Sequence, residues 1–339
     1  MLLLWLSLFV GCHALSSPAL TSALLKISYD GKHFSGWTAG NHHPAPNETD
    51  PSTSSAGRKR RRRRKTPPGY VRSVQGLLKD NLARVYGNID PSRIVVEGAS
   101  RTDAGVHAVG MVVLVYALVE DYTVSTTTGK RLPHPHNATD ASQFLPLPMP
   151  LEQLAFALNR MSPDDLRVVA YAVPPSRIHP SVDAVAKTYR YRLATSWDHP
   201  THRRLVWKVR GDTNDVALQQ ACFALLGTHD YRFARGAPRG ADDRRKFAAQ
   251  DTVCTLHRVE WNEEENGITI SGDRFLYKMV RFLVGTLVAV RQGKLTVDDV
   301  QNMLETGERS PLIECAPAHG LVLEEVHYDC ALEWHAAAS

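Results

Sequence analysis

The order of the predicted strands and helices limits the fold of this chain more than any other feature of its sequence. Hydrophobic periodicity from residue 23 onward predicts a strand, a helix, two strands, a helix and a strand. Much the same order then follows a second time. Because the long β-α-β repeats of a fully parallel sheet are missing, this order favours an α+β fold with two similar halves and a mostly antiparallel sheet.

The individual elements are predicted from apolar periodicity and from the residues that flank it. In the first half we expect strands at 23–29, 94–96, 111–118 and 166–173, and helices at 73–86 and 151–160. In the second half we expect strands at 187–194, 255–261, 267–271 and 321–327, and helices at 216–226, 275–290 and 296–304. Ser73 can cap the start of the first helix, and Gly87 can close its end.

These elements divide the chain into two α+β domains. We expect a leader at 1–21, an N-terminal domain at 22–175, a C-terminal domain at 176–331 and a tail at 332–339. The N-terminal domain is interrupted twice, because 42–68 and 120–147 are polar and lack an apolar period. The first of these insertions is predicted to be disordered.

The basic residues are concentrated in one run, 58–65 (RKRRRRRK), inside the first insertion. The chain holds 40 Lys and Arg against 35 Asp and Glu, so its balance is negative once these eight cations are set aside. Any nucleic-acid surface on the folded core is therefore a local patch. The run itself is open to three interpretations: a nuclear localisation signal, an RNA-grasping segment, or a solvated insertion without a dedicated role.

The N-terminus is apolar over residues 1–10 and is followed by small residues suited to a cleavage site, although a basic start region is missing. This stretch is too short for a comfortable membrane span. The apolar stretch 275–290 contains Lys278 and Arg281, which argues against a lipid-facing helix. We therefore expect no stable membrane span. The leader favours an organelle, plastid or mitochondrion, whereas the basic run offers the nucleus or cytoplasm as the alternative.

A charged loop with flanking glycines, 97–108, lies between two predicted strands, where functional loops are often held. Gly98 and Gly105 permit tight turns of the backbone. Arg101 and Asp103 bring opposite charges close together, which can keep a carboxylate ionised. Because such loops are turn salt bridges more often than active sites, the loop alone leaves both interpretations open.

Residues 101–107 (RTDAGVH) resemble the R-T-D-x-G-V-H signature of the TruA-type tRNA pseudouridine synthases. Further segments resemble this family in its own order, namely 26–37 (KISYDGKHFSGW), 187–191 (KTYRY), 226–233 (LGTHDYRF), 275–281 (FLYKMVR) and 316–321 (APAHGL). Apart from the two insertions, the resemblance runs from about residue 25 to residue 326. Collinear matches over that length are highly specific.

The resemblance implies a pseudouridine synthase fold with a central RNA-binding cleft between the two halves. It implies an isomerase that converts uridine to pseudouridine in tRNA without a cofactor or metal. The partners it implies are tRNA and a second copy of the chain in a homodimer. The target uridine would leave the RNA stack, and Asp103 would be the catalytic carboxylate that starts glycosidic cleavage.

Within tRNA, the uridines that this resemblance points to are those at positions 38 to 40 of the anticodon stem-loop.

Three further residues take roles from their places in the matched motifs. Tyr189 matches the family tyrosine that packs on the target base and takes part in proton transfer, as an aromatic face with a hydroxyl edge can. Arg281 matches the arginine that pairs with the catalytic aspartate, and Arg101 matches the one that holds the displaced nucleotide. Taken without the resemblance, Tyr189 is a strand tyrosine of the core and Arg281 a surface cation, and both alternatives stay open.

The sequence departs from the family pattern at two places. Thr38 stands where the opening motif continues G-W-Q, and Ser181 stands at the arginine of F-H-A-R-x-S-A. These changes leave the details of the substrate and full catalytic competence open.

A group of cations near Tyr231 and Phe233 has the composition of a surface for structured RNA, or of a solvated loop. Its members are Arg232, Arg235, Arg239, Arg244, Arg245 and Lys246.

Two other functions stay open beside the synthase. A non-catalytic relative would bind tRNA or other RNA without modifying it, whereas a hydrolase would use Asp103 with His107 and release free base.

A metal at Asp103 and His107 is not expected, because no further ligands follow at metal spacing. The five cysteines are odd in number and contain no C-x-x-C pair, so neither a disulfide framework nor a zinc cluster is expected.

Overall fold

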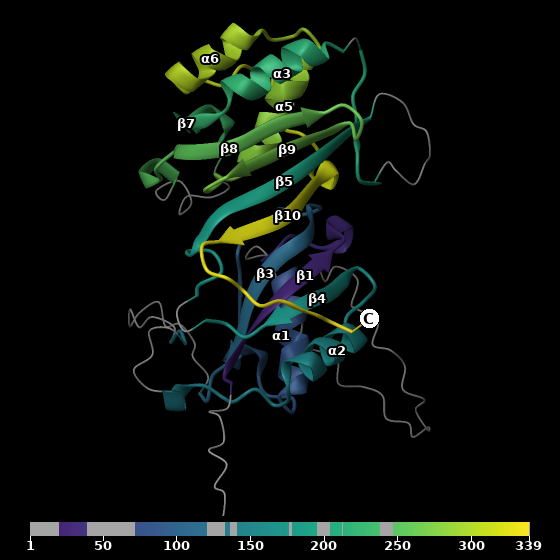
Figure 1. The fold of residues 1–339 in the computed structure, drawn as a ribbon, viewed down its shortest axis with the longest axis vertical. Helices are drawn as coiled ribbons and strands as arrows, with labels where there is room; N and C mark the ends of the chain where they lie inside the picture. Colours follow the sequence, from purple (N-terminus) through teal and green to yellow (C-terminus); the bar gives the residue numbers. More distant parts are fainter. Residues whose placement is uncertain are drawn as a thin grey trace, which may run out of the picture.

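The computed structural model describes residues 20–38, 72–120, 133–135, 141–175, 178–194, 204–211, 213–237 and 247–338. Most of the predicted leader, all of the basic insertion at 42–68, and residues 239 and 244–246 of the cation group lie outside these ranges. Within them, eleven strands form one mixed sheet, with helices packed beside it at both ends (Figure 1). The predicted α+β fold with a mostly antiparallel sheet is therefore confirmed.

The first half of the sheet is built around one long buried strand. Its strands are β1 (Ser22–Tyr29), β2 (Ile94–Gly98), β3 (His107–Ala117) and β4 (Leu166–Ala172), and its helices are α1 (Val74–Val85) and α2 (Leu151–Met161). The strand β3 pairs antiparallel with both β1 and β2, and β1 pairs with β4. Nearly every side chain of β3 is buried, as expected for a central strand covered on both faces.

The second half repeats this plan with a larger helical layer. Its strands are β5 (Ala184–Ala194), β6 (Trp207–Lys208), β7 (Gly227–Asp230), β8 (Val253–Asn262), β9 (Gly267–Gly272) and β10 (Leu321–Tyr328). Its helices are α3 (Asp215–Ala224), α5 (Met279–Arg291) and α6 (Val297–Thr306). The helix α5 is apolar almost all round, as a buried helix must be. Most of its residues are buried, and α3 packs beside it (Figure 1).

The strand β10 joins the two halves. It pairs antiparallel with β5 along most of its length and parallel with β3 through Val322 and Leu323. The chain then crosses the first half and ends in β11 (His335–Ala336), which pairs with β4 at the opposite edge of the sheet (Figure 1). The domain boundary predicted after residue 175 stays a prediction.

Several element limits differ from those predicted. The helix α5 begins at Met279 rather than at 275, because Lys278 has a left-handed backbone with φ of 59°. The strand β3 begins four residues earlier than predicted, since the pairing of its first residues with β10 is a contact between distant segments. Among the described helices, none is long and apolar enough to cross a membrane.

Candidate active site

The turn at Gly36 and Trp37, which follows β1, holds the loop between β2 and β3 in place. Gly36 and Asp103 form an isolated antiparallel bridge, and the Trp37 amide donates to the Thr102 carbonyl at 3.0 Å. Gly36 has φ of +106°, and a Cβ there would lie 2.7 Å from the Thr102 oxygen. Only glycine allows this close approach of the two backbones. The turn therefore determines where the Asp103 backbone lies.

Thr102 ties the same loop to the core. Its hydroxyl lies 2.7 Å from the hydroxyl of Tyr29, a buried residue at the end of β1. Thr102 itself is buried, while its neighbours Arg101 and Asp103 are more accessible. One anchored residue thus holds two charged neighbours at the surface of the cavity described below.

Asp103 forms an ion pair with Arg281, which lies 178 positions further along the chain. The Nη1 atom of Arg281 lies 2.9 Å from Oδ2 of Asp103, and the two side chains are only 15% and 18% exposed. The Nε–H of Arg281 donates to the Ala316 carbonyl at 2.7 Å, so the guanidinium is held on two sides. Such a fixed, partly desolvated pair is a charge-assisted contact with defined geometry.

Tyr189 reaches the other side of the loop from β5. Its hydroxyl lies 2.8 Å from the Ser100 hydroxyl, and its ring meets Phe275 edge to face at 5.2 Å. Burial raises the pKa of Tyr189 to about 12, and the negative charge of Asp103 adds to this against the Ser100 hydrogen bond. The hydroxyl is therefore protonated at neutral pH and can donate a hydrogen bond.

The four residues singled out from the sequence line one cavity of about 450 Å³. This volume lies in the range of small-ligand pockets. Arg101, Thr102 and Asp103 come from the loop, Tyr189 from β5, and Arg281 from the first turn of α5. In the described part of the chain, no ion pair or hydrogen bond holds the exposed Arg101 side chain, which leaves this cation available to a ligand.

Other lining residues were not singled out as site residues. They include Ser181, Lys187, Gln250, Phe275 and Lys278. Phe275, Lys278 and Lys187 lie inside matched motifs, so the motifs could have indicated them. Gln250 has no signal in the sequence, because only the fold brings it to the cavity. Burial lowers the pKa of the Lys187 ammonium, against the opposing effect of Asp273.

The structure does not bring His107 to the cavity. Its ring is buried, with Nδ1 3.1 Å from Oδ1 of Asp30 and 3.2 Å from the Gly31 amide. Burial lowers the pKa of His107, although Asp30 opposes this effect. Because His107 does not line the cavity that Asp103 lines, the geometry gives no support to a hydrolase that uses these two side chains together.

The predicted aromatic and basic RNA surface around residues 231–246 is wrong in its aromatic part. Tyr231 and Phe233 are both buried, so neither ring can stack on a base. Both residues come directly after β7 and pack into the core, whereas the sequence indicated an exposed segment there. Arg235 stacks on Phe247 at 3.4 Å, and Arg232 lies 3.5 Å from Asp230.

Comparison with known proteins gives one consistent result. Residues 221–329 match a family described as tRNA pseudouridine synthase. The chain is 33% identical over 262 residues to "tRNA pseudouridine synthase A" of Bacillus subtilis (strain 168), an alignment that covers 76% of this chain and 90% of that protein. It is 30% identical over 317 residues to "tRNA pseudouridine synthase A 2" of Protochlamydia amoebophila (strain UWE25), covering 92% and 96%.

Proposed function

Since the chain belongs to the TruA-type family of tRNA pseudouridine synthases, we propose that it converts uridine to pseudouridine in tRNA, with Asp103 as the catalytic carboxylate. The observation that carries this proposal is the ion pair between Asp103 and Arg281, 2.9 Å long, at the wall of a cavity of about 450 Å³. A carboxylate so held is fixed in position yet accessible to a ligand. The isomerisation needs no cofactor, because the carboxylate itself supplies the nucleophile or base.

The proposed reaction begins when the target uridine leaves the RNA stack and enters this cavity. Asp103 starts the cleavage of the glycosidic bond, as a nucleophile or as a base. The uracil rotates and rejoins the ribose through carbon 5, and the carboxylate is released. Arg281 keeps Asp103 in place during these steps, because its second contact to the Ala316 carbonyl restricts the guanidinium.

Tyr189 and Arg101 are proposed to bind the displaced nucleotide. The Tyr189 ring offers an apolar face for the base, and its neutral hydroxyl can donate a proton or hydrogen bond. Arg101 offers a planar guanidinium for a phosphate. Ser181 lines the cavity where the family motif has an arginine, and we propose that Lys187 or Lys278 supplies the cationic contact there.

We further propose that the target uridines lie in the anticodon stem-loop and that the protein is a homodimer, both by analogy with the family. Mapping of pseudouridine in tRNA incubated with the protein tests the first point, and sedimentation tests the second. We also propose an organelle as its compartment, on the strength of the apolar leader. Fluorescent fusions with and without the first 21 residues test this, and nuclear fluorescence would contradict it.

The central experiment compares Asp103→Asn with Asp164→Asn. Asp164 is a suitable control because it also pairs with an arginine, Arg167, but at a fully exposed position. We expect Asp103→Asn to lower pseudouridine formation by at least about 10³-fold, as loss of a catalytic nucleophile does, while the melting temperature stays close to that of the wild type. Asp164→Asn should leave the rate unchanged.

Three outcomes would contradict the proposal in different ways. Full activity of Asp103→Asn would remove Asp103 from the chemistry. Tight binding of tRNA without pseudouridine formation by the wild type would favour a non-catalytic relative. Release of free uracil, measured by chromatography of the reacted RNA, would favour a hydrolase.

A further inference from the structure

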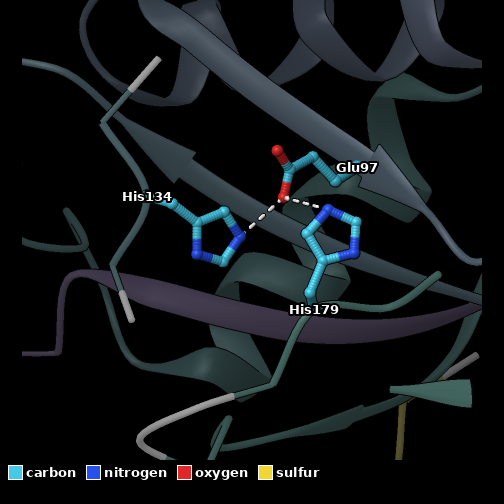
Figure 2. A group of neighbouring side chains, drawn as sticks. All are labelled: Glu97, His134 and His179. Carbon is cyan, nitrogen blue, oxygen red and sulfur yellow. Dashed lines mark hydrogen bonds and ion pairs between the residues drawn. The ribbon is translucent and has the colours of Figure 1, made fainter. Parts of the chain in front are cut away.

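Three side chains from separate segments meet around one carboxylate oxygen (Figure 2). Glu97 lies in β2, His134 in the described stretch 133–135, and His179 shortly before β5. The Nε2 atom of His134 lies 2.8 Å from Oε2 of Glu97, and Nε2 of His179 lies 3.8 Å from the same oxygen. One ligand atom of each residue lies within 4.8 Å of the other two.

Hydrogen bonding accounts for the His134 contact but not for the approach of His179 to the same oxygen. The two imidazole rings are stacked, with centroids 5.3 Å apart and planes at 25°, and each directs a nitrogen toward the same oxygen (Figure 2). The contact of His134 is a hydrogen bond, but 3.8 Å is too long for one from His179. A cation between the three atoms would contact all of them.

The surroundings of the three residues hold them in place. The Tyr116 hydroxyl donates to the carbonyl of Pro133 at 3.1 Å, and its ring meets His134 edge to face at 5.7 Å. Burial raises the pKa of Tyr116, and the charge of Glu97 adds to the effect. The side chains of His134, Glu97 and His179 are 13%, 22% and 34% exposed, so the cluster is partly buried yet reachable from solvent.

We propose that Glu97, His134 and His179 bind one divalent transition-metal ion of the zinc type. Imidazole nitrogen and carboxylate oxygen are ordinary zinc ligands, and two histidines with one glutamate form a known zinc set with one open position. Zinc bonds of about 2.1 Å in a tetrahedron hold ligand atoms about 3.4 Å apart. The distances of 2.8 and 3.8 Å lie on either side of this value, so small shifts of the ligand atoms and a change of tautomer at His179 would complete the site.

The ion would act on the structure and not on the reaction. None of the three residues lines the catalytic cavity, so no step of the isomerisation passes through the site. The ion would connect β2, which leads into the catalytic loop, with the stretch 133–135 and with the segment that leads into β5 of the second half. This inference does not depend on the proposed function, because metal binding is measured without substrate.

Metal binding should also change the turn that follows His179. The Nδ1 atom of His179 accepts hydrogen bonds from the amides of Ser181 and Val182, each at 3.2 Å. A neutral ring that binds metal through Nε2 carries its proton on Nδ1, so it cannot accept them. We therefore expect faster hydrogen exchange at these two amides in the metal-bound protein. Ser181 lines the catalytic cavity, so this turn connects the two sites.

The experiment uses the full chain, freed of metal with a chelator and titrated with Zn²⁺ against a chromophoric competitor, with Co²⁺ in parallel. We expect one equivalent to bind, and Co²⁺ to give the absorption of a four-coordinate ion. His134→Ala and Glu97→Gln should each weaken binding at least about tenfold. His257→Ala, at an exposed histidine of β8, is the matched control and should bind like the wild type.

Two results would overturn the proposal. One is wild-type protein that unfolds cooperatively but binds no stoichiometric Zn²⁺. The other is equal affinity in wild type, His134→Ala and Glu97→Gln, which would assign the ion to another site. Melting curves recorded without metal separate loss of a ligand from loss of the fold, because both variants should then melt like the metal-free wild type.

Discussion

The Arg281 side chain makes two contacts at once, to the Asp103 carboxylate and to the Ala316 carbonyl. A lysine has one compact ammonium and cannot reproduce both contacts. We expect Arg281→Gln to lower the rate of pseudouridine formation by about 10² to 10³-fold, as loss of a preorganised polar contact does, and Arg281→Lys to lie between it and the wild type. Single-turnover kinetics measures the effect. Arg167→Gln, at an exposed pair, is the control, and a rate in Arg281→Gln equal to the control would remove Arg281 from the site.

The raised pKa of Tyr189 predicts a change of stability with pH. Its value rises from 10.0 to about 12 on folding. The unfolded chain therefore loses this proton above pH 10 while the folded chain keeps it, so the stabilisation present below pH 10 is lost between pH 10 and 12. In this window the free energy of unfolding should fall about 1.4 kcal/mol per pH unit more steeply for the wild type than for Tyr189→Phe. Denaturant titrations at several pH values measure both slopes, and equal slopes would contradict the prediction.

Part of the candidate site could be predicted from the sequence, and the rest depends on how distant segments pack. Arg101, Asp103, Tyr189 and Arg281 lie in motifs, and the cavity contains all four. The cluster around Glu97 was not predicted, because its members are separated by tens of residues and follow no ligand spacing. Their proximity depends on how β2 and the connecting segments pack, which local sequence does not specify.

At the scale of elements, the helix α5 depends on one close contact with the segment that follows α6. A Cβ on Gly285 would lie 1.9 Å from the Glu314 carbonyl oxygen, which belongs to the backbone and cannot rotate away. The Ala316 carbonyl that holds Arg281 lies two residues further on. We expect Gly285→Ala to lower the free energy of unfolding by about 1 to 3 kcal/mol, as overpacking does, and to slow the reaction.

Gly76 of α1 offers a matched control for Gly285. Both glycines lie inside helices, where alanine is favoured by about 1 kcal/mol. At Gly76 the nearest atom to an added Cβ is the Ser73 hydroxyl at 3.0 Å, a side chain that can rotate away at the cost of its cap bond to the Gly76 amide. We expect Gly76→Ala to change stability by less than about 1 kcal/mol in thermal unfolding. Similar losses in both variants would show that the Glu314 contact is not the cause.

The predicted elements agree best where periodicity is long and local. The helix α1 and the β8–β9 hairpin lie close to their predicted limits, because cap residues and the turn at Asn266 mark them. The strands β7 and β11 were not predicted, since they have four and two residues and exist through pairing with β8 and β4. Short strands of this kind depend on tertiary contacts more than on their own residues.

At the scale of the whole molecule, the described residues that flank the basic insertion, 35–37 and 72–75, are held together beside the catalytic loop. The Ser35 amide donates to the Arg72 carbonyl at 2.9 Å, and the Gln75 amide donates to the Trp37 carbonyl at 3.0 Å. Trp37 in turn contacts Thr102, next to Asp103. The segment that contains the eight cations at 58–65 is therefore joined to the described fold at residues beside the loop that carries the proposed catalytic residue.

This tether predicts how the run contributes to binding of tRNA. Cations that neutralise phosphates release counterions, so each contact adds about 0.7 to 0.9 to the slope of log affinity against log salt. We expect replacement of 58–65 by eight glycines and serines to weaken tRNA binding and to reduce that slope by at least about 2, while the melting temperature stays the same. Filter-binding titrations at several salt concentrations measure the slope. The balance of charge outside the run is slightly acidic, so a slope that did not change would mean that local patches on the folded core supply all the phosphate contacts and that the run serves another purpose.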